Sequence, residues 1–280
     1  MTDGSDADGG GVLSALKCMF SFFTIVRLDV GQKEFDAMER NFWAVPVVGF
    51  VNGLIAAVIC ILLAEAGVSP LLQGVAALVT VFVFSKFLHF DGLTDFGDGM
   101  VVSSGNREDH IRALKDSLIG AGGFGVALTV VLISVACYTD IAVRWGAVAA
   151  AVFAAEILVK NAQVAAAAFG EPGNGMASRQ VGMTGGKSLV GSTVLSAVLL
   201  AAVYLIYRFA ADARGYAFDG GAIAVCMILG LLISVLTGWL MARTANRTFG
   251  FVNGDILGAT NEISRAVMLV MTAVVLGMWV

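Results

Sequence analysis

The chain has 280 residues, of which 58% are hydrophobic and only 14% are charged. A soluble domain usually carries about 25% charged residues, and the mean hydropathy here is +0.88. This composition excludes an ordinary water-soluble domain, whereas the net charge of −4 says little until the charges are placed. Repeated apolar windows of about 20 residues, the length that crosses a bilayer as a helix, predict an integral membrane protein.

The N-terminal residues 1–11, MTDGSDADGGG, are acidic and glycine-rich and contain almost nothing to bury. We expect them to be disordered rather than to form a signal peptide, since they have no basic region and no small-residue cleavage site. Residues 12–280 are expected to form one integral-membrane domain. The scattered spacing of the four cysteines predicts neither a disulfide framework nor a zinc site.

The apolar runs are continuous, which predicts an all-α, polytopic membrane bundle of about seven transmembrane helices rather than a β-barrel. Residues 14–28, SALKCMFSFFTIVRL, are too short for a comfortable crossing and predict an N-terminal interfacial or re-entrant helix. The predicted spans are residues 42–66, 70–90, 117–138, 145–169, 188–209, 221–242 and 258–280.

Lys and Arg are unevenly distributed between the loops. With the N-terminus inside, the inside segments contain twelve of these residues and the outside segments contain three, Arg144, Arg208 and Arg214. This positive-inside bias predicts a multi-pass protein of the cytoplasmic (inner) membrane. It places residues 86–116, 170–187 and 243–257 on the cytoplasmic face.

The segment HFDGLTDFGDGM, residues 89–100, contains the most informative motif. Asp91, Asp95 and Asp98 are spaced so that they share one face of a helix. Three like charges beside a low-dielectric boundary repel one another unless a cation binds between them. Mg²⁺ is the natural cation, because it takes oxygen ligands from one or two carboxylates, substrate phosphates and water. The alternative is a solvated helix end whose acids mark the water boundary.

A second acidic segment, FVNGDILGATNEISR, supplies Asp255 and Glu262 far along the chain. Glu262 falls inside the last predicted span, where an unpaired carboxylate is costly and usually functional. Arg265, three residues later, offers it a structural partner instead. In the fourth span we expect Glu156 and Lys160 to neutralise each other, because they are spaced i,i+4 on a helix.

The predicted cytoplasmic face also carries the residues expected to bind phosphates. VGMTGGKS, residues 181–188, fails as a phosphate loop, because the pattern requires Gly where the chain has Val181. His89 is expected either to orient an aspartate or contact a phosphate, or to be an exposed interfacial histidine, whereas His110 is expected to be solvated. The cationic candidates are Arg112, Lys115, Arg179 and Lys187.

Three blocks resemble motifs of the cobalamin synthase family, the adenosylcobinamide-GDP ribazoletransferases. HFDGLTDFGDG is similar to that family's H-x-D-G-L-x-D-x-x-D-G, and LKDSLIGAGGFG to its later D-S-x-x-G-x-x-G block. GDILGATNE resembles the C-terminal G-D-x-x-G-A-x-x-E. The order and separation of the blocks also agree, so the resemblance covers most of the chain.

The resemblance implies a Mg²⁺-dependent transferase that joins adenosylcobinamide-GDP to α-ribazole or its 5′-phosphate and releases GMP. It implies that Asp91, Asp95, Asp98 and Asp255 bind the metal, and that catalysis uses Asp255, Asp98 and His89. Arg112 and Lys115 would then meet the GDP phosphates. Asp116 and Glu262 are expected to support the site.

Two other functions remain open from the sequence. A phosphotransferase acting on CDP-alcohols has a similar acidic signature, but the chain lacks its Ala-Arg step. A cation-coupled transporter would use Glu156, Lys160 and Glu262 as an ion path, although the acids gather at one face and no repeat is visible. The expected partners are small-molecule substrates and the lipid bilayer, and no nucleic acid is expected. The sequence leaves open whether the chain forms a homo-oligomer.

Overall fold

The computed structural model describes residues 10–103, 105–216 and 219–278, so most of the predicted disordered N-terminus lies outside the described part. Within these ranges the chain is built from helices, with an isolated β-bridge between Pro172 and Val252. The all-α prediction is therefore confirmed. The four cysteines are free.

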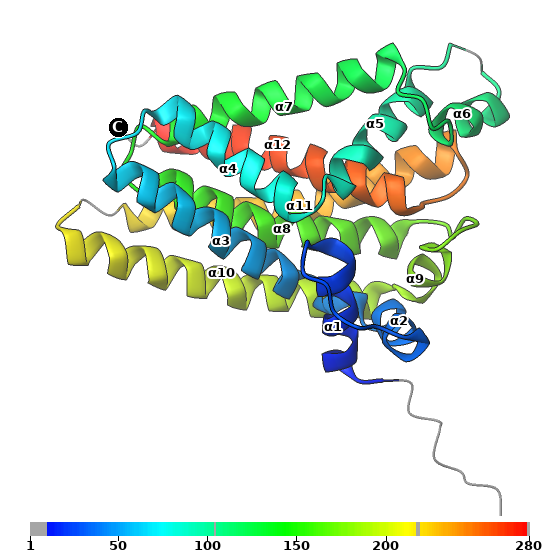
Figure 1. The fold of residues 1–280 in the computed structure, drawn as a ribbon, viewed down its shortest axis with the longest axis horizontal. Coiled ribbons are helices and arrows are strands. Elements are labelled where there is room, and N and C mark those ends of the chain that lie inside the picture. Colours follow the sequence, from blue (N-terminus) through cyan, green and yellow to red (C-terminus); the bar gives the residue numbers. More distant parts are fainter. Residues whose placement is uncertain (1–9, 104, 217–218, 279–280) are drawn as a thin grey trace, which may run out of the picture.

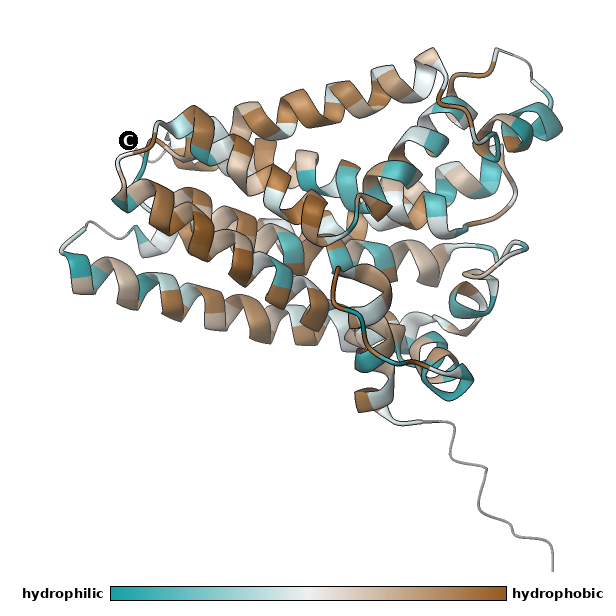
Figure 2. Ribbon diagram, in the orientation of Figure 1, coloured by the Kyte–Doolittle hydropathy of each residue, from teal (hydrophilic) through white to brown (hydrophobic). Residues whose placement is uncertain are grey.

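Six helices in the described part are long and apolar enough to cross a membrane, and they lie side by side in the bundle of Figure 1. They agree with six of the predicted spans, and in Figure 2 much of their length has the brown of hydrophobic residues. The helices are α3 (Pro46–Glu65, preceded by the short 3-10 turn η1, Phe42–Ala44), α7 (Ala121–Ile141), α8 (Ala147–Phe169), α10 (Gly186–Arg214), α11 (Gly220–Thr248) and α12 (Gly254–Met278).

Local sequence explains where several of these helices begin and end. Pro46 opens α3 at a position where its missing N–H is not needed. The side chain of Asp219 accepts a 3.0 Å hydrogen bond from the Ala222 N–H and so caps α11. Gly215 ends α10 with a φ of +68°, a backbone conformation that favours glycine.

Helix α8 forms the centre of the bundle. In its apolar window 83% of the residues are buried, compared with 22% in α7 and in α10. Glycines on α3 let the neighbouring backbone approach: a Cβ at Gly49 would lie 2.1 Å from the carbonyl oxygen of Glu156 on α8. This close packing of small residues is typical of helices in lipid.

The predicted span 70–90 is wrong as a single helix. The structure has α4 (Pro70–Phe84) and α5 (Leu88–Met100), which meet at an angle of 93°. Between them Lys86 and Phe87 have φ values of 55° and 57°, in the left-handed region, and so break the helix. As a result α5 turns away from α4 and leads toward α6 (Figure 1).

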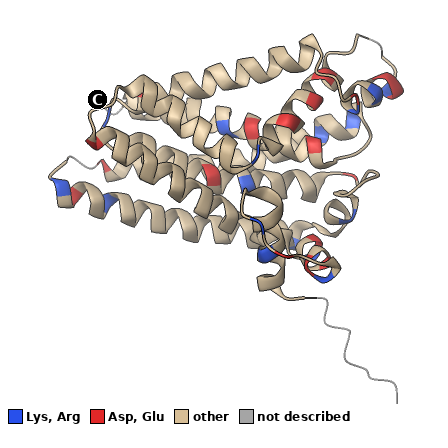
Figure 3. Cartoon of the chain, in the orientation of Figure 1, with Lys and Arg blue, Asp and Glu red and all other residues tan. Residues whose placement is uncertain are grey.

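Four short helices gather near one end of the bundle, and charged residues are concentrated there (Figures 1 and 3). They are α1 (Val12–Phe23), α2 (Gln32–Arg40), α6 (Arg107–Leu114) and α9 (Ser178–Met183). The structure confirms a short apolar helix at the predicted N-terminal position. Helix α1 runs across the direction of the long helices (Figure 1) and buries Ala15, Cys18, Met19 and Phe23.

Candidate functional site

Helix α5 carries the acidic motif at this end of the bundle. Asp91, Asp95 and Asp98 fall at i, i+4 and i+7 of one continuous helix, so they share a face as predicted. Asp91 is exposed, whereas Asp95 and Asp98 are partly buried. None of the three forms an ion pair with Lys or Arg in the described ranges.

The start of α12 lies directly against this face. Gly92 allows the contact, because a Cβ there would lie 2.6 Å from the carbonyl oxygen of Asp255. The Asp255 side chain accepts a 2.7 Å hydrogen bond from Asn253 Nδ2, which fixes its orientation. Asp95 experiences the negative charges of Asp255 and Asp91. The structure thus brings together acids that are about 160 positions apart in sequence.

Asp98 has a different environment from the other acids. Its two carboxylate oxygens accept hydrogen bonds of 2.7 Å each from the backbone N–H groups of Gly120 and Gly123. The amides lie at the N-terminus of α7, where the helix dipole favours a negative charge. A Cβ at Gly120 would come within 2.4 Å of the carboxylate, so glycine is required for this contact. Asp98 therefore anchors α7 to α5.

The donor set suits a divalent cation that also binds substrate. No three His, Cys, Asp or Glu side chains in the described part of the chain are grouped as a ready-made metal site. Mg²⁺ does not need such a group, because it usually keeps several waters and takes only one or two protein carboxylates beside substrate phosphates. Asp91, Asp95 and Asp255 provide oxygen donors of the right kind on two adjoining helices.

The four predicted phosphate-binding cations lie at the same end but in different settings. Lys115 is close enough to Asp255 to act on it electrostatically, and its Nζ lies 6.0 Å from the centre of the Phe251 ring. Arg112 is paired with Asp109 at 2.9 Å, and its side chain is 78% exposed. Lys187 is exposed at the start of α10. Of the four, Lys115 is the cation linked to the acids.

Arg179 forms ion pairs with two acids of α2. Its guanidinium lies 3.2 Å from Asp36 and 3.3 Å from Glu39. A hydrogen bond from Gln32 and the charge of Arg179 lower the pKa of Asp36 below its ordinary value. The ion pairs therefore tie α9 to α2.

Two further predicted residues have local partners. Asp116 is exposed, and its carboxylate accepts a 3.0 Å hydrogen bond from the N–H of Leu118. The sequence predicts that His110 is solvated, but the structure gives its ring two partners. Its Nδ1 lies 2.7 Å from the carbonyl oxygen of Gly99, and its ring meets that of Phe249 edge to face. It thus links α6 to α5.

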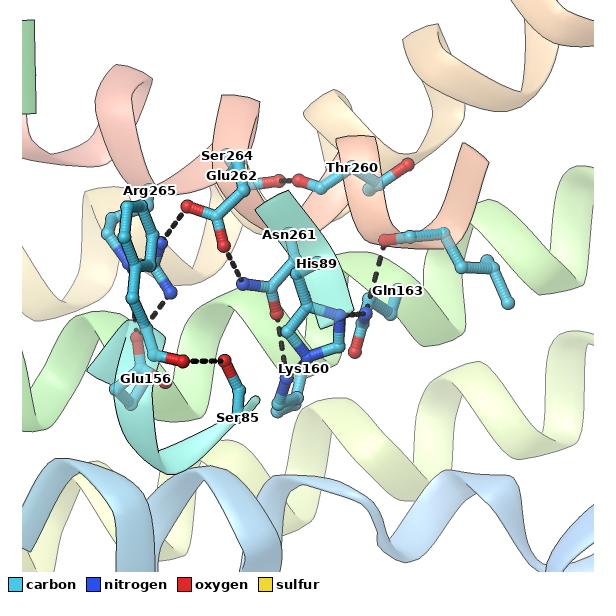
Figure 4. Close-up of polar contacts among 12 residues, drawn as sticks. Ser85, His89, Glu156, Lys160, Gln163, Thr260, Asn261, Glu262, Ser264 and Arg265 are labelled. Carbon is cyan, nitrogen blue, oxygen red and sulfur yellow. Dashed lines mark hydrogen bonds and ion pairs between the residues drawn. The ribbon is translucent and has the colours of Figure 1, made fainter. Parts of the chain in front are cut away.

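His89 is buried, contrary to the expectation of an exposed interfacial histidine, and only 3% of it is accessible. Its Nε2 lies 2.6 Å from Lys160 Nζ, and its Nδ1 lies 3.4 Å from Gln163 Nε2 (Figure 4). The ring stacks on Phe23 with 5.9 Å between centroids. Both ring nitrogens are therefore engaged by α8, and within the described part of the chain neither has an aspartate as its hydrogen-bond partner.

A network of buried charges lies behind His89. Arg265 donates to Glu156 at 2.7 Å and also to Glu262 (Figure 4). The pairing of Glu262 with Arg265 is thus confirmed, and it places Glu262 in a structural network. The predicted pairing of Glu156 with Lys160 is wrong, because Lys160 turns instead to His89 and to Asn261 Oδ1 at 2.8 Å.

Sequence reasoning missed Gln163, Asn261 and Asn253. The first two are buried polar side chains within apolar helices, and Gln163 Nε2 donates to the Leu257 carbonyl oxygen at 3.1 Å. The available signal was their polarity inside otherwise apolar spans, where polar groups are rare and usually partnered. Asn253 lies two residues before Asp255, within the segment that was already singled out.

A cavity of about 290 Å³ opens beside the acids. Asp91, Asp255 and Asn253 line one part of it, and His89 and Gln163 line its floor. Most of the remaining lining comes from α1, α2, η1 and the segment that leads into α9. Fold and site together define a multi-pass helical membrane protein with a carboxylate-lined cavity at one end of its bundle.

Comparison with known proteins agrees with this architecture. The family model for cobalamin-5-phosphate synthase matches residues 15–273. An adenosylcobinamide-GDP ribazoletransferase of Halorubrum lacusprofundi is 32% identical over 271 residues, covering 92% of this chain and 96% of the relative. A ribazoletransferase of Bradyrhizobium diazoefficiens is 30% identical over 270 residues, covering 94% of each chain. No solved structure matches this chain.

The chain belongs to the cobalamin-5-phosphate synthase family, as its motifs suggested. It is a membrane-embedded enzyme of the transferase class.

Proposed function

We propose that the protein is a Mg²⁺-dependent adenosylcobinamide-GDP ribazoletransferase that acts in cobalamin synthesis. It joins adenosylcobinamide-GDP to α-ribazole or α-ribazole 5′-phosphate and releases GMP. A ribose hydroxyl attacks the phosphate attached to cobinamide, the bond between the two phosphates breaks, and the hydroxyl proton passes to a base. The observation that carries this proposal is the contact of Asp255 with α5, which places Asp91 and Asp255 in one cavity.

The carboxylates of α5 and α12 beside this cavity have the chemistry that the reaction needs. Asp91, Asp95 and Asp255 would hold Mg²⁺, which supplies Lewis-acid stabilisation of phosphate charge when bound. We assign proton acceptance from the hydroxyl to Asp255, because Asn253 orients it at the cavity wall. Asp98, which sequence resemblance places among the ligands and catalytic groups, serves in this proposal to hold α7, since both its oxygens bind amides.

Cationic side chains at the same end suit the diphosphate. Lys115 is the proposed phosphate-binding residue because it is linked electrostatically to Asp255. Arg112 and Lys187 add positive charge at the same end of the bundle, where both are exposed. His89 and Glu262 act in this proposal by fixing α5 and α12 against α8, since both are buried and hydrogen-bonded.

GMP release tests the proposed reaction. Purified protein in liposomes, given adenosylcobinamide-GDP, α-ribazole and Mg²⁺, is expected to form GMP, and a chelator is expected to stop it. The Asp91→Ala variant is expected to lose turnover while remaining folded. An absence of GMP across a range of divalent cations would refute the proposal.

We also propose that the protein lies in the cytoplasmic membrane with the cavity facing the cytoplasm. The excess of Lys and Arg in the segments at this end supports that orientation. A cysteine introduced at the exposed Ser103, in a background without the native cysteines, is expected to resist membrane-impermeant reagents added from outside. Labelling of this cysteine from the outside would contradict the proposed orientation.

A further inference from the structure

The cavity beside the acids has two unlike walls. One wall carries the carboxylates Asp91 and Asp255 together with the amide of Asn253. The other wall is aromatic and comes from the N-terminal region: Phe22, Phe23, Phe35 and Phe42 all line it. A ligand that fills this space therefore has a polar, oxygen-rich part beside the acids and a flat apolar part among the rings.

The aromatic wall is held in place by its own packing. Phe23 meets Phe22 edge to face with 5.0 Å between centroids and lies 6.4 Å from Phe42. Its ring also lies against that of His89 at 5.9 Å and within 5.7 Å of Lys160 Nζ. The wall is thus fixed to α5 and α8, whereas Phe35 on α2 is only partly buried where it lines the cavity.

A buried polar atom at the floor of the cavity lacks a partner. Gln163 is 1% exposed, and its Oε1 has no hydrogen-bond partner in the described structure. Its Nε2 is already directed to Leu257 and His89 (Figure 4). An unsatisfied buried acceptor costs about 1–3 kcal/mol, so it suits a ligand that donates an O–H group at that point.

The size of the cavity indicates which of the two substrates of the proposed reaction fits inside it. A volume of about 290 Å³ is at the lower end of the range for small-molecule sites. It suits a single nucleoside, whereas a corrin macrocycle with its side chains is far larger. The charged residue of the aromatic side, Glu39, is paired with Arg179, so this wall suits an uncharged base.

We propose, on the basis of the proposed function, that this cavity binds the nucleoside substrate, with its uncharged heteroaromatic base between the phenylalanines of α1, α2 and η1. The ribose lies on the polar side, where Gln163 Oε1 accepts a hydroxyl and the attacking oxygen faces Asp255. The corrinoid stays outside this pocket and presents its diphosphate at the mouth. Phe35 is then a residue that determines specificity for the base.

Steady-state kinetics with a Phe35→Ala variant test the assignment. The KM for α-ribazole is expected to rise about tenfold because one face of the base loses its packing, while the KM for adenosylcobinamide-GDP stays unchanged. A Phe35→Trp variant narrows the space and is expected to favour the riboside of unsubstituted benzimidazole over the dimethylated one. Phe209→Ala is the matched control, because that ring is 77% exposed on α10 and does not line the cavity.

Equilibrium dialysis of labelled α-ribazole against the purified full chain measures the same site without turnover. Binding is expected to weaken in Phe35→Ala and to be retained in Phe209→Ala; Phe35→Leu replaces the alanine variant if that protein does not fold. Unchanged nucleoside binding in both Phe35 variants, or a rise confined to the KM of the corrinoid, would overturn the inference. Wild-type protein that binds α-ribazole but releases no GMP would refute the proposed reaction and leave the nucleoside site standing.

Discussion

Two groups of charged side chains lie close together in this molecule and are organised in opposite ways. In the buried network, Arg265 pairs with both Glu156 and Glu262, and Lys160 donates to Asn261. The acid face of α5 is the side of the helix that carries Asp91, Asp95 and Asp98. Here Asp91 and Asp95 have no Lys or Arg ion-pair partner in the described ranges, and Asp255 adds a further negative charge.

The difference separates charges that hold the fold from charges that we propose bind a cation. A buried carboxylate is tolerated when a cation and hydrogen bonds compensate its lost hydration, as around Arg265. Unpaired acids at the bundle end repel one another, and that repulsion is relieved when a divalent cation binds. We therefore expect substitutions in the buried network to reduce stability. Substitutions of the acids on α5 and α12 are expected to reduce activity.

The largest expected effect comes from removing the shared cation of the buried network. Arg265→Met leaves Glu156 and Glu262 without their partner in a site where Arg265 is 1% exposed. We expect a loss of about 3–5 kcal/mol in the free energy of unfolding, measured by denaturation in mixed micelles. A second variant that also carries Glu156→Gln and Glu262→Gln should recover part of the loss. Equal stability of Arg265→Met and wild type would show that the network does not support the fold.

Removing one charge from the acid face is expected to act on turnover instead. Asp255→Asn keeps the shape of the side chain but weakens its hold on a cation and its capacity to take a proton. We expect GMP release to fall about 1,000-fold while unfolding is nearly unchanged. Asp116→Asn is the control, because Asp116 is exposed and bonds locally to Leu118. Comparable losses in the two variants would contradict the assignment of Asp255.

The contact between α5 and α12 can be tested without changing a charge. A Cβ in Gly92→Ala would lie 2.6 Å from the Asp255 carbonyl oxygen, so the helices must move apart. Since displacements of about 1 Å can cost about 100-fold, we expect turnover to fall about 10- to 100-fold. Gly125→Ala on α7 is the matched control, with no atom within 4 Å of its new Cβ. Full activity in Gly92→Ala would separate the contact from catalysis.

The smallest effect on stability is expected at Arg179, whose side chain is 56% exposed and pairs with the partly exposed Asp36 and the largely buried Glu39. Pairs with an exposed partner contribute about 0–1 kcal/mol. The amide of Gln can still donate a hydrogen bond to Glu39, so Arg179→Gln is expected to change stability by about 1 kcal/mol and kcat by less than about threefold, measured in the same assays. A large rise in the KM for adenosylcobinamide-GDP would instead assign Arg179 to the diphosphate, the role that its position in the sequence suggested.

Much of the architecture could be predicted because the signals are strong and local. Apolar length identified six of the spans, and the i, i+4, i+7 spacing placed three aspartates on one face of a helix. The approach of Asp255 to that face was expected from motif resemblance. The break before α5 had no such signal, because its left-handed residues are Lys86 and Phe87 rather than glycine.

The ion-pair and hydrogen-bond partners of the buried side chains could not be predicted from their spacing in the sequence. Glu156 and Lys160 are ideally placed for an i,i+4 pair, yet helices α5 and α12 supply other partners for both. The orphan acceptor of Gln163 and the aromatic wall of the cavity likewise depend on contacts between distant segments, such as that of Phe23 on α1 with His89 on α5. Long-range packing, rather than local propensity, decides these contacts.

The central claim is that Asp91, Asp95 and Asp255 form one cation-binding site. It is tested most directly by titrating Mn²⁺ into the purified protein and following free Mn²⁺ by electron paramagnetic resonance, with Mg²⁺ as competitor. The account predicts binding by wild type that Mg²⁺ displaces, and at least about tenfold weaker binding in Asp91→Asn and in Asp255→Asn. Equal Mn²⁺ binding by wild type and both variants would contradict it.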